Sequence, residues 1–247
     1  MHIIKNIPFK LSLILFVLVI FFPQIIQAQM FSVGDPEPRD TRAIGTYTLI
    51  GVSWEIADFE FTGENVAPQD QANFNSNVIR FHLENPGLHL SAGFGGRITG
   101  MNETSYVNIN AMLYNDTPIV RSPRFILSVP FQIITDLKRA QPNESTNDFQ
   151  QSSLIFGTGI SSRARLADRV DFAARITPNY GFSFSQGALF GGSLFRTNGN
   201  VRLYFNNIIG ENSLSVGYDF DYRNYDIEGG ENDYRYTSHA ITVGFAF

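Results

Sequence analysis

Residues 234–247 read YRYTSHAITVGFAF, and their side chains alternate between two kinds. One set is large and apolar and the other is small or weakly polar; the sets are Ile241, Val243, Phe245 and Phe247, and Ala240, Thr242, Gly244 and Ala246. Successive side chains of a β-strand point to opposite faces, so this period of two predicts a strand with one apolar face. The strand runs to an aromatic residue, Phe247, at the last position of the sequence.

The same alternation recurs along the chain from residue 44 onward, and no window there shows the 3.6-residue period of a helix. In segment 213–223 the apolar positions are Leu214, Val216, Tyr218, Phe220 and Tyr222, and polar or small residues stand between them. Segments 124–133, 170–176 and 201–206 follow the same pattern. The sequence therefore predicts an all-β protein.

The first 28 residues have a different character. Lys5 and Lys10 precede or border an apolar run over residues 11–22, and residues 23–28 end on the small Ala28. This order is typical of a secretory signal peptide, which we expect to be cleaved after about Ala28. The apolar run is shorter than the roughly 20 residues that a membrane-spanning helix needs.

The composition excludes several classes of function. The chain has no cysteine, so it holds no disulfide, no thiolate metal site and no cysteine nucleophile. Its net charge of −5 gives no electrostatic basis for binding nucleic acid. The remaining residues show no motif for a cofactor or a bound metal, and we predict neither. The sequence carries no signal for an oligomeric state.

Alternation alone fits two kinds of all-β protein. In a soluble secreted β-sandwich the apolar faces form the core, whereas in a membrane barrel they meet lipid and the polar faces line the lumen. The export signal, Phe247 and aromatic residues placed near strand ends, such as Trp54 and Tyr180, favour the barrel. We therefore predict a transmembrane antiparallel up-and-down β-barrel, with the soluble sandwich as an alternative.

The C-terminal part of the chain carries a family resemblance. Residues 200–247, with LYFN at 203–206, LSVGY at 214–218 and the closing segment 239–247, resemble the last strands of small outer-membrane β-barrel proteins of Gram-negative bacteria. This resemblance implies an outer-membrane location, contact with outer-membrane lipid, and insertion by the barrel-assembly machinery through the strand that ends at Phe247. The expected organisation is a signal peptide over 1–28, a periplasmic leader or small plug over 29–43, and a barrel over 44–247.

Turn-forming residues divide the barrel region into about twelve strands, with eight or ten as alternatives. We expect breaks at Asn85-Pro86-Gly87, Pro178-Asn179 and Asn198-Gly199-Asn200, among others. Polar stretches at 63–76, 136–151 and 227–233 are predicted to be long loops on the external side, which an even strand number permits. The expected strands are 44–61, 77–84, 87–98, 104–113, 123–135, 152–164, 169–177, 179–185, 187–196, 199–206, 212–225 and 234–247.

The phase of the alternation places charged residues on the inward faces, because an arginine facing lipid at the midplane costs about 2–4 kcal/mol. The predicted lumen-lining residues are Arg80, His82, Arg97, Arg124, Arg163, Arg165, Asp171, Arg175, Arg202, Asp219, Asp221 and Arg223. Two interpretations follow. Either Arg and Asp side chains fill the lumen as ion pairs, or an excess of positive charge makes a pore that favours anions.

One enzymatic alternative rests on His89 and Ser91, followed by Glu103. The pattern resembles the outer-membrane phospholipase and lipid A deacylase barrels, and the resemblance would make Ser91 the nucleophile, His89 the base and Glu103 the orienting acid. Two departures count against it: the strand phase turns His89 and Ser91 inward, and Ala92 stands where the family has Asn. We therefore predict a non-enzymatic, porin-like or structural role.

Overall fold

A computed structural model describes residue 44 and residues 46–64, 73–142, 149–185, 191–227 and 233–247. The predicted signal peptide over 1–28 and the leader or plug over 29–43 lie outside the described residues. No helix in these ranges is both long enough and apolar enough to span a membrane.

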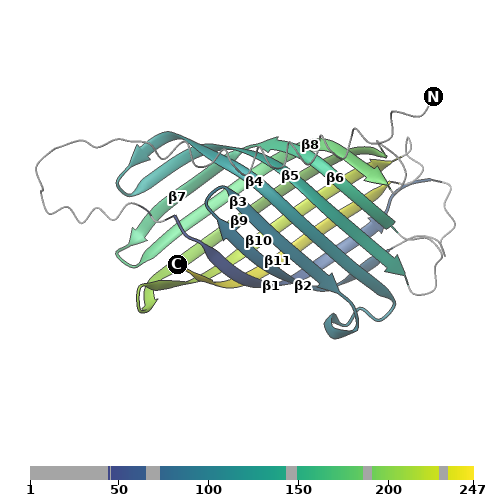
Figure 1. Ribbon diagram of the computed structural model, residues 1–247, viewed down its shortest axis with the longest axis horizontal. Helices are drawn as coiled ribbons and strands as arrows, with labels where there is room; N and C mark the ends of the chain where they lie inside the picture. The colour runs from purple at the N-terminus through teal and green to yellow at the C-terminus, as the bar shows by residue number, and fades with distance from the viewer. Residues whose placement is uncertain (1–43, 45, 65–72, 143–148, 186–190, 228–232) are drawn as a thin grey trace, which may run out of the picture. The chain divides into compact units, whose positions relative to one another are not determined.

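Eleven β-strands dominate the described chain (Figure 1). They are β1 (Leu49–Phe61), β2 (Phe74–Asn85), β3 (Leu88–Gly95), β4 (Thr104–Ser122), β5 (Phe125–Pro142), β6 (Phe149–Thr158), β7 (Ile160–Ala167), β8 (Val170–Ser185), β9 (Gly192–Ile209), β10 (Asn212–Ile227) and β11 (Tyr234–Ala246). A single turn of 3₁₀ helix, η3 (Arg97–Thr99), lies between β3 and β4.

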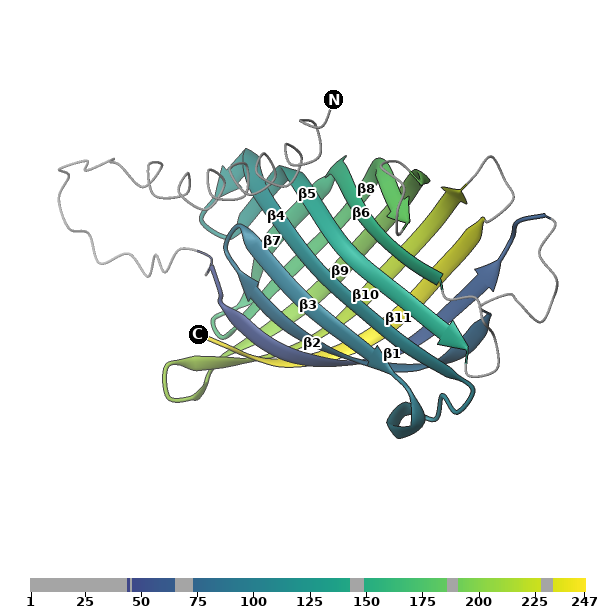
Figure 2. The ribbon, with the colours of Figure 1, turned by 45° about the vertical axis from the view of Figure 1, so that its right-hand side comes forward.

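The strands close into one antiparallel up-and-down barrel (Figure 2). β1 pairs with β11 from Leu49↔Ala246 to Phe61↔Tyr234, which joins the two ends of the sheet. β6 and β7 follow one another between β5 and β8, separated by Gly159, and so share one place in the wall. The barrel therefore has ten strand positions. The predicted barrel is confirmed, the count of twelve is wrong, and the alternative of ten is correct.

The count differs because two predicted turns are continuous strand. Pro178-Asn179 lies within β8, and Asn198-Gly199-Asn200 lies within β9. The side chains of Asn179 and Asn198 point into the lumen, where Asn179 Nδ2 donates to Asn198 Oδ1 at 2.8 Å. Gln132 Nε2 donates to both amide oxygens, at 2.6 and 2.9 Å. Polar side chains are suited to these two positions because both face the lumen. The pairing of the strands overrides the turn preference of asparagine there.

The connections between strands differ in length at the two ends of the barrel. Those at 86–87, 123–124, 168–169 and 210–211 have two residues each, and Phe247 lies at the same end. At the other end the connections span 62–73, 96–103, 143–148, 186–191 and 228–233. The expected sorting of loops by length is therefore present with ten strands. The predicted loop 136–151 is mostly wrong, because residues 136–142 continue β5 and residues 149–151 begin β6.

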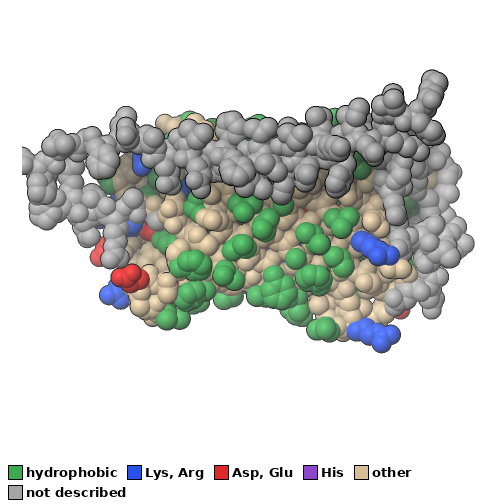
Figure 3. Space-filling model, in the orientation of Figure 1, with side chains coloured by type: hydrophobic (Ala, Val, Ile, Leu, Met, Phe, Trp, Pro, Cys, Tyr) green, Lys and Arg blue, Asp and Glu red, His purple; other side chains and the backbone are tan. Residues whose placement is uncertain are grey.

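The two faces of the wall differ in polarity. On β1 the outward side chains Ile50, Val52, Trp54 and Ile56 are about half exposed, whereas Ser53 and Glu55 between them are buried in the lumen. Figure 3 shows apolar side chains across the middle of the visible face, and charged side chains toward its ends. A soluble sandwich would bury its apolar faces, so that alternative is wrong for this fold.

Gly159 marks the break between β6 and β7, and we predict that it cannot be enlarged. A Cβ at this position would collide with the backbone carbonyl oxygen of Ile176 on β8. We expect Gly159→Ala to lower the free energy of unfolding by about 1–3 kcal/mol, the usual cost of overpacking. Urea unfolding in lipid vesicles, followed by the fluorescence of Trp54, the one tryptophan of the chain, measures this change. Gly96→Ala is the control, because no heavy atom lies within 4 Å of its Cβ position; equal stabilities of the two variants would contradict the prediction.

Candidate functional site

The lumen gathers most of the charged residues of the barrel, so it is the candidate functional site. Ten of the twelve residues that the sequence assigns to the lumen have inward side chains: Arg80, His82, Arg163, Arg165, Asp171, Arg175, Arg202, Asp219, Asp221 and Arg223. Each of them makes a hydrogen bond to another lumenal side chain.

The assignment of Arg97 and Arg124 to the lumen is wrong. Arg97 is exposed in η3, and Arg124 is exposed in the two-residue turn between β4 and β5. Arg97 lies after the end of β3, and Arg124 lies before the start of β5. Side chains outside a strand do not alternate between two faces, so the strand phase does not apply to them.

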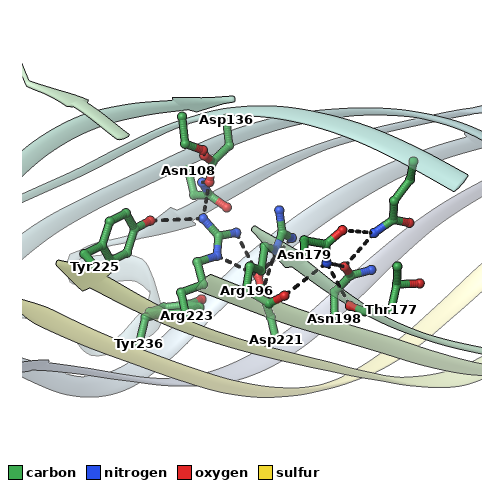
Figure 4. Close-up of polar contacts among 12 residues, drawn as sticks. Asn108, Asp136, Thr177, Asn179, Arg196, Asn198, Asp221, Arg223, Tyr225 and Tyr236 are labelled. Carbon is green, nitrogen blue, oxygen red and sulfur yellow. Dashed lines mark hydrogen bonds and ion pairs between the residues drawn. The ribbon is translucent and has the colours of Figure 1, made fainter. Parts of the chain in front are cut away.

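A network of charged side chains crosses the lumen (Figure 4). Arg196 on β9 binds Asp221 on β10 through two bonds of 2.8 and 3.0 Å. Arg223 Nη2 donates to the same carboxylate at 2.7 Å, and Nη1 donates to Asp136 on β5. Arg80 binds Glu55 in the same two-bonded manner, at 2.7 and 2.8 Å. These are charge-assisted bonds between groups that are almost fully removed from solvent.

The lumenal charges nearly balance, which removes the predicted excess of positive charge. Within the described chain, the lumen holds eight basic side chains, Arg80, Lys138, Arg163, Arg165, Arg175, Arg196, Arg202 and Arg223. It holds seven acidic ones, Glu55, Glu84, Asp116, Asp136, Asp171, Asp219 and Asp221. Sequence reasoning missed six of these residues, and the inward phase of their strands was the signal that could have found them: Glu55 on β1, Glu84 on β2, Asp116 on β4, Asp136 and Lys138 on β5, and Arg196 on β9.

Aromatic side chains fill the lumen toward the end with the long connections. Phe59 stacks on Tyr234 with ring centroids 4.8 Å apart, and it meets Phe149 edge-on at the same distance. Tyr106 and Tyr236 stack at 6.3 Å, and Lys138 Nζ lies over the ring of Tyr236. Lys138 is completely buried and its ammonium group makes no hydrogen bond within the described chain. Aromatic faces therefore take the place of acceptors for this cation.

Toward the end with the short turns, three further ionic groups occupy the lumen. Arg202 Nη2 bridges Glu84 and Asp219 at 2.9 and 2.7 Å. Arg163 and Arg175 share Asp116. Asp171 binds Arg165 and accepts a 2.6 Å hydrogen bond from Tyr47, which precedes β1. Burial of the phenol, together with this hydrogen bond, raises the pKa of Tyr47, so its hydroxyl stays a donor at neutral pH.

Described side chains from opposite walls meet across the lumen at several places. β1 and β6 face each other across the ten-position ring, and their residues Phe59 and Phe149 are in contact. Asp136 on β5 meets Arg223 on β10, and Glu84 on β2 meets Arg202 on β9; both pairs join strands four positions apart. A lumenal cavity beside Arg80, His89 and Asp219 measures about 60 Å³. That volume holds only a few water molecules.

The residues of the hydrolase pattern do not form a catalytic triad. Ser91 and His89 lie on the inward face of β3, as their phase predicts. Glu103 is exposed in the connection at the far end of β3 and β4. Ser91 pairs with Asn110, seven positions along β4 from Glu103, which corresponds to a separation of roughly 23 Å. Glu103 therefore cannot orient His89. The imidazole instead contacts His82 at 3.1 Å and Glu84 at 3.9 Å.

The solved structures that resemble this chain do so at low sequence identity. No protein-family model and no curated protein matches the chain. The translocator domain of the autotransporter NalP from Neisseria meningitidis aligns with 83% of this chain and 89% of that domain, at 8% identity and a TM-score of 0.42. The outer-membrane protease OmpT from Escherichia coli aligns with 82% of this chain and 94% of its own, at 8% identity and a TM-score of 0.37. Ail from Yersinia pestis aligns with 82% and 99%, at 10% identity and a TM-score of 0.25.

The central ion pairs should be essential for stability. We expect Arg223→Met to destabilise the barrel by about 3–5 kcal/mol, because it leaves the buried carboxylate of Asp136 without its countercharge. A second substitution, Asp136→Asn, should recover part of the loss by removing that charge. The free energy of unfolding from urea titration in vesicles measures both effects.

The matched control is Arg235→Met on β11. Arg235 faces outward, its side chain is half exposed, and its ion pair with Glu60 is 3.9 Å long. Exposed pairs of this kind contribute less than about 1 kcal/mol. A similar loss for Arg223→Met and Arg235→Met would show that the lumenal pairs carry no special weight.

Proposed function

We propose that this protein is an outer-membrane β-barrel with a closed lumen and a structural, non-enzymatic role. The contact between Phe59 and Phe149, from opposite walls of the barrel, carries the proposal. In this role the barrel anchors the chain in the membrane and presents the strand ends that bear the longer connections at the surface. A porin-like role is the second candidate, favoured only by the polar character of the lumen.

The outer surface supports the membrane location. Outward side chains of β1 are apolar from Ile50 to Ile56 and become acidic at Asp58 and Glu60. The partner positions on β11 change in the same way, from Phe245 and Val243 to Thr237 and Arg235. An apolar band bounded by polar residues is what a barrel presents to a bilayer. The backbone of the wall is paired without a free edge, which a spanning structure requires in lipid.

The lengths of the connections support an orientation. Outer-membrane barrels of bacteria have short periplasmic turns and longer external loops. The four two-residue turns would then face the periplasm, together with the charged groups around Asp171. The aromatic cluster of Phe59, Phe149 and Tyr234 would then lie at the external end of the lumen, the end with the longer connections.

The location can be tested with the single tryptophan. Trp54 lies in the middle of the apolar band and is half exposed. We expect its fluorescence to be strongly quenched in vesicles whose acyl chains carry bromine. A Trp54→Phe, Glu60→Trp variant places the indole on the same face of β1 but beyond the band, and it should be quenched weakly. Equal quenching of the two proteins, or recovery of the folded chain without detergent, would overturn the membrane location.

The closed lumen predicts that the folded protein does not conduct ions. We expect no stepwise conductance after fusion of proteoliposomes with a planar bilayer, at either polarity. Insertion is verified in the same vesicles by the heat-modifiable migration of the folded barrel on a gel. Regular conductance steps from inserted protein would favour the porin-like role. Because the quenching experiment reports on location alone, the two results separate a wrong location from a wrong lumen.

A further inference from the structure

We propose that His82, Glu84 and His89 form a lumenal binding site for a divalent transition-metal ion of the zinc class. One ligand atom from each side chain lies within 4.8 Å of the other two. The three residues come from one hairpin: Glu84 on β2 pairs with His89 on β3, and His82 lies one inward position away along β2. Two imidazoles and one carboxylate are a donor set that suits zinc and its neighbours, and they leave a coordination position open.

The distances fit one shared ion once the carboxylate of Glu84 moves toward the two imidazoles. Zinc binds nitrogen and carboxylate oxygen at about 2.0–2.2 Å, so a tetrahedral site holds its ligand atoms about 3.4 Å apart. His82 Nδ1 and His89 Nε2 are 3.1 Å apart, which agrees with this value, and His89 Nε2 is 3.9 Å from Glu84 Oε1, about 0.5 Å too far. The remaining separation, bounded by 4.8 Å, needs a carboxylate shift of roughly 1.4 Å at most.

A chain of hydrogen bonds prepares the His82 nitrogen for a metal. Thr242 donates its one hydroxyl proton to Asp219, so its oxygen must accept from Ser53, 2.7 Å away. Ser53 thereby uses its own proton, and its oxygen accepts from His82 Nε2. In the neutral imidazole the other nitrogen, Nδ1, then carries a lone pair, and it is this atom that faces His89. A histidine that binds a metal through one ring nitrogen usually donates a hydrogen bond from the other, as His82 Nε2 does here to Ser53.

The surroundings leave space and access for the ion. The 60 Å³ cavity is lined by His82, His89, Ser91 and Asn110, so water can occupy the open coordination position. The side chains of His89 and Glu84 keep 14% and 15% of their exposure. Both lie within two positions of the turn at 86–87, at the end of the barrel with the short connections. Glu84 also accepts a hydrogen bond from Arg202 at Oε1, and its carboxylate keeps further lone pairs for an ion.

Metal titration of the folded protein, purified without a histidine tag, tests the site. We expect one Co²⁺ per chain, with the visible absorption of a nitrogen-coordinated ion, displaced by Zn²⁺. His82→Gln and His89→Gln should each weaken binding by about 100-fold or more, and Ser53→Ala by about 10–100-fold through the lost hydrogen bond to His82. His239→Gln is the matched control, because His239 faces outward and contacts Tyr218; its affinity should equal that of the wild type.

A measurement on the wild type keeps the test independent of variant folding. Pulsed electron paramagnetic resonance of bound Cu²⁺ should detect two imidazole nitrogens. The proposal is overturned if the wild type binds no Co²⁺ or Cu²⁺, or if the folded His82→Gln and His89→Gln variants bind as tightly as the wild type. It is equally overturned if the imidazole signal disappears in His239→Gln. None of these results depends on whether the barrel conducts ions or where it resides.

Discussion

The pairing of β1 with β11 is the constraint on which the rest of the structure depends. It runs over thirteen residue pairs, from Leu49↔Ala246 to Phe61↔Tyr234, and it leaves the sheet without a free edge. Once the wall is closed, each strand has one face that can only point inward and one that can only point outward. The structure has an apolar outer face and a polar inner face, and the proposed membrane location accounts for both, because apolar surface is stable in lipid and charge is not. Apolar and polar side chains therefore alternate along the strands, as they do on β1 and β11.

A closed ring of ten positions imposes a second condition on what the inner face contains. Side chains from opposite walls come within contact distance, so charged groups in the lumen are removed from water almost as completely as in a protein core. A buried charge is tolerated only when it is paired and hydrogen-bonded. Arg223 and Arg202 meet that requirement, because each contacts two carboxylates. Lys138 differs, because its amine lies over the ring of Tyr236 without a hydrogen bond within the described chain. The described part of the lumen is therefore packed with paired polar side chains, and this packing is the basis of the closed lumen proposed above.

The sequence predicted the barrel, the inward phase and the sorting of loop lengths, but it did not predict the strand number. The period of two is imposed by the wall and is visible in every strand, so phase could be read locally. Turn propensity is also local, and it fails at Asn179 and Asn198, where residues typical of turns are selected to hydrogen-bond across the lumen. Two such false breaks, one in β8 and one in β9, raised the count by two and left its parity unchanged. This is why a wrong number still sorted the short and long connections correctly. The omission of Asp136 has another origin: it lies in a polar stretch that is typical of a loop, although it continues β5.

The hairpin of β2 and β3 shows how much a single turn can determine. The turn at 86–87 fixes the register so that residue numbers of facing pairs have a constant sum, which places Glu84 opposite His89 and His82 opposite Ser91. A pattern search along the chain finds His89 next to Ser91 and assigns them hydrolytic chemistry, since it compares residues two apart on one strand. The register of the hairpin determines which residues of β2 and β3 face each other, and it brings the imidazoles of His82 and His89 next to the carboxylate of Glu84. Glu103, which the linear pattern requires, lies beyond the other end of β3, seven positions along the chain from Asn110, the partner of Ser91. In a barrel, chemistry is set by facing positions on neighbouring strands, so the turn that defines those positions is the more informative part of the sequence.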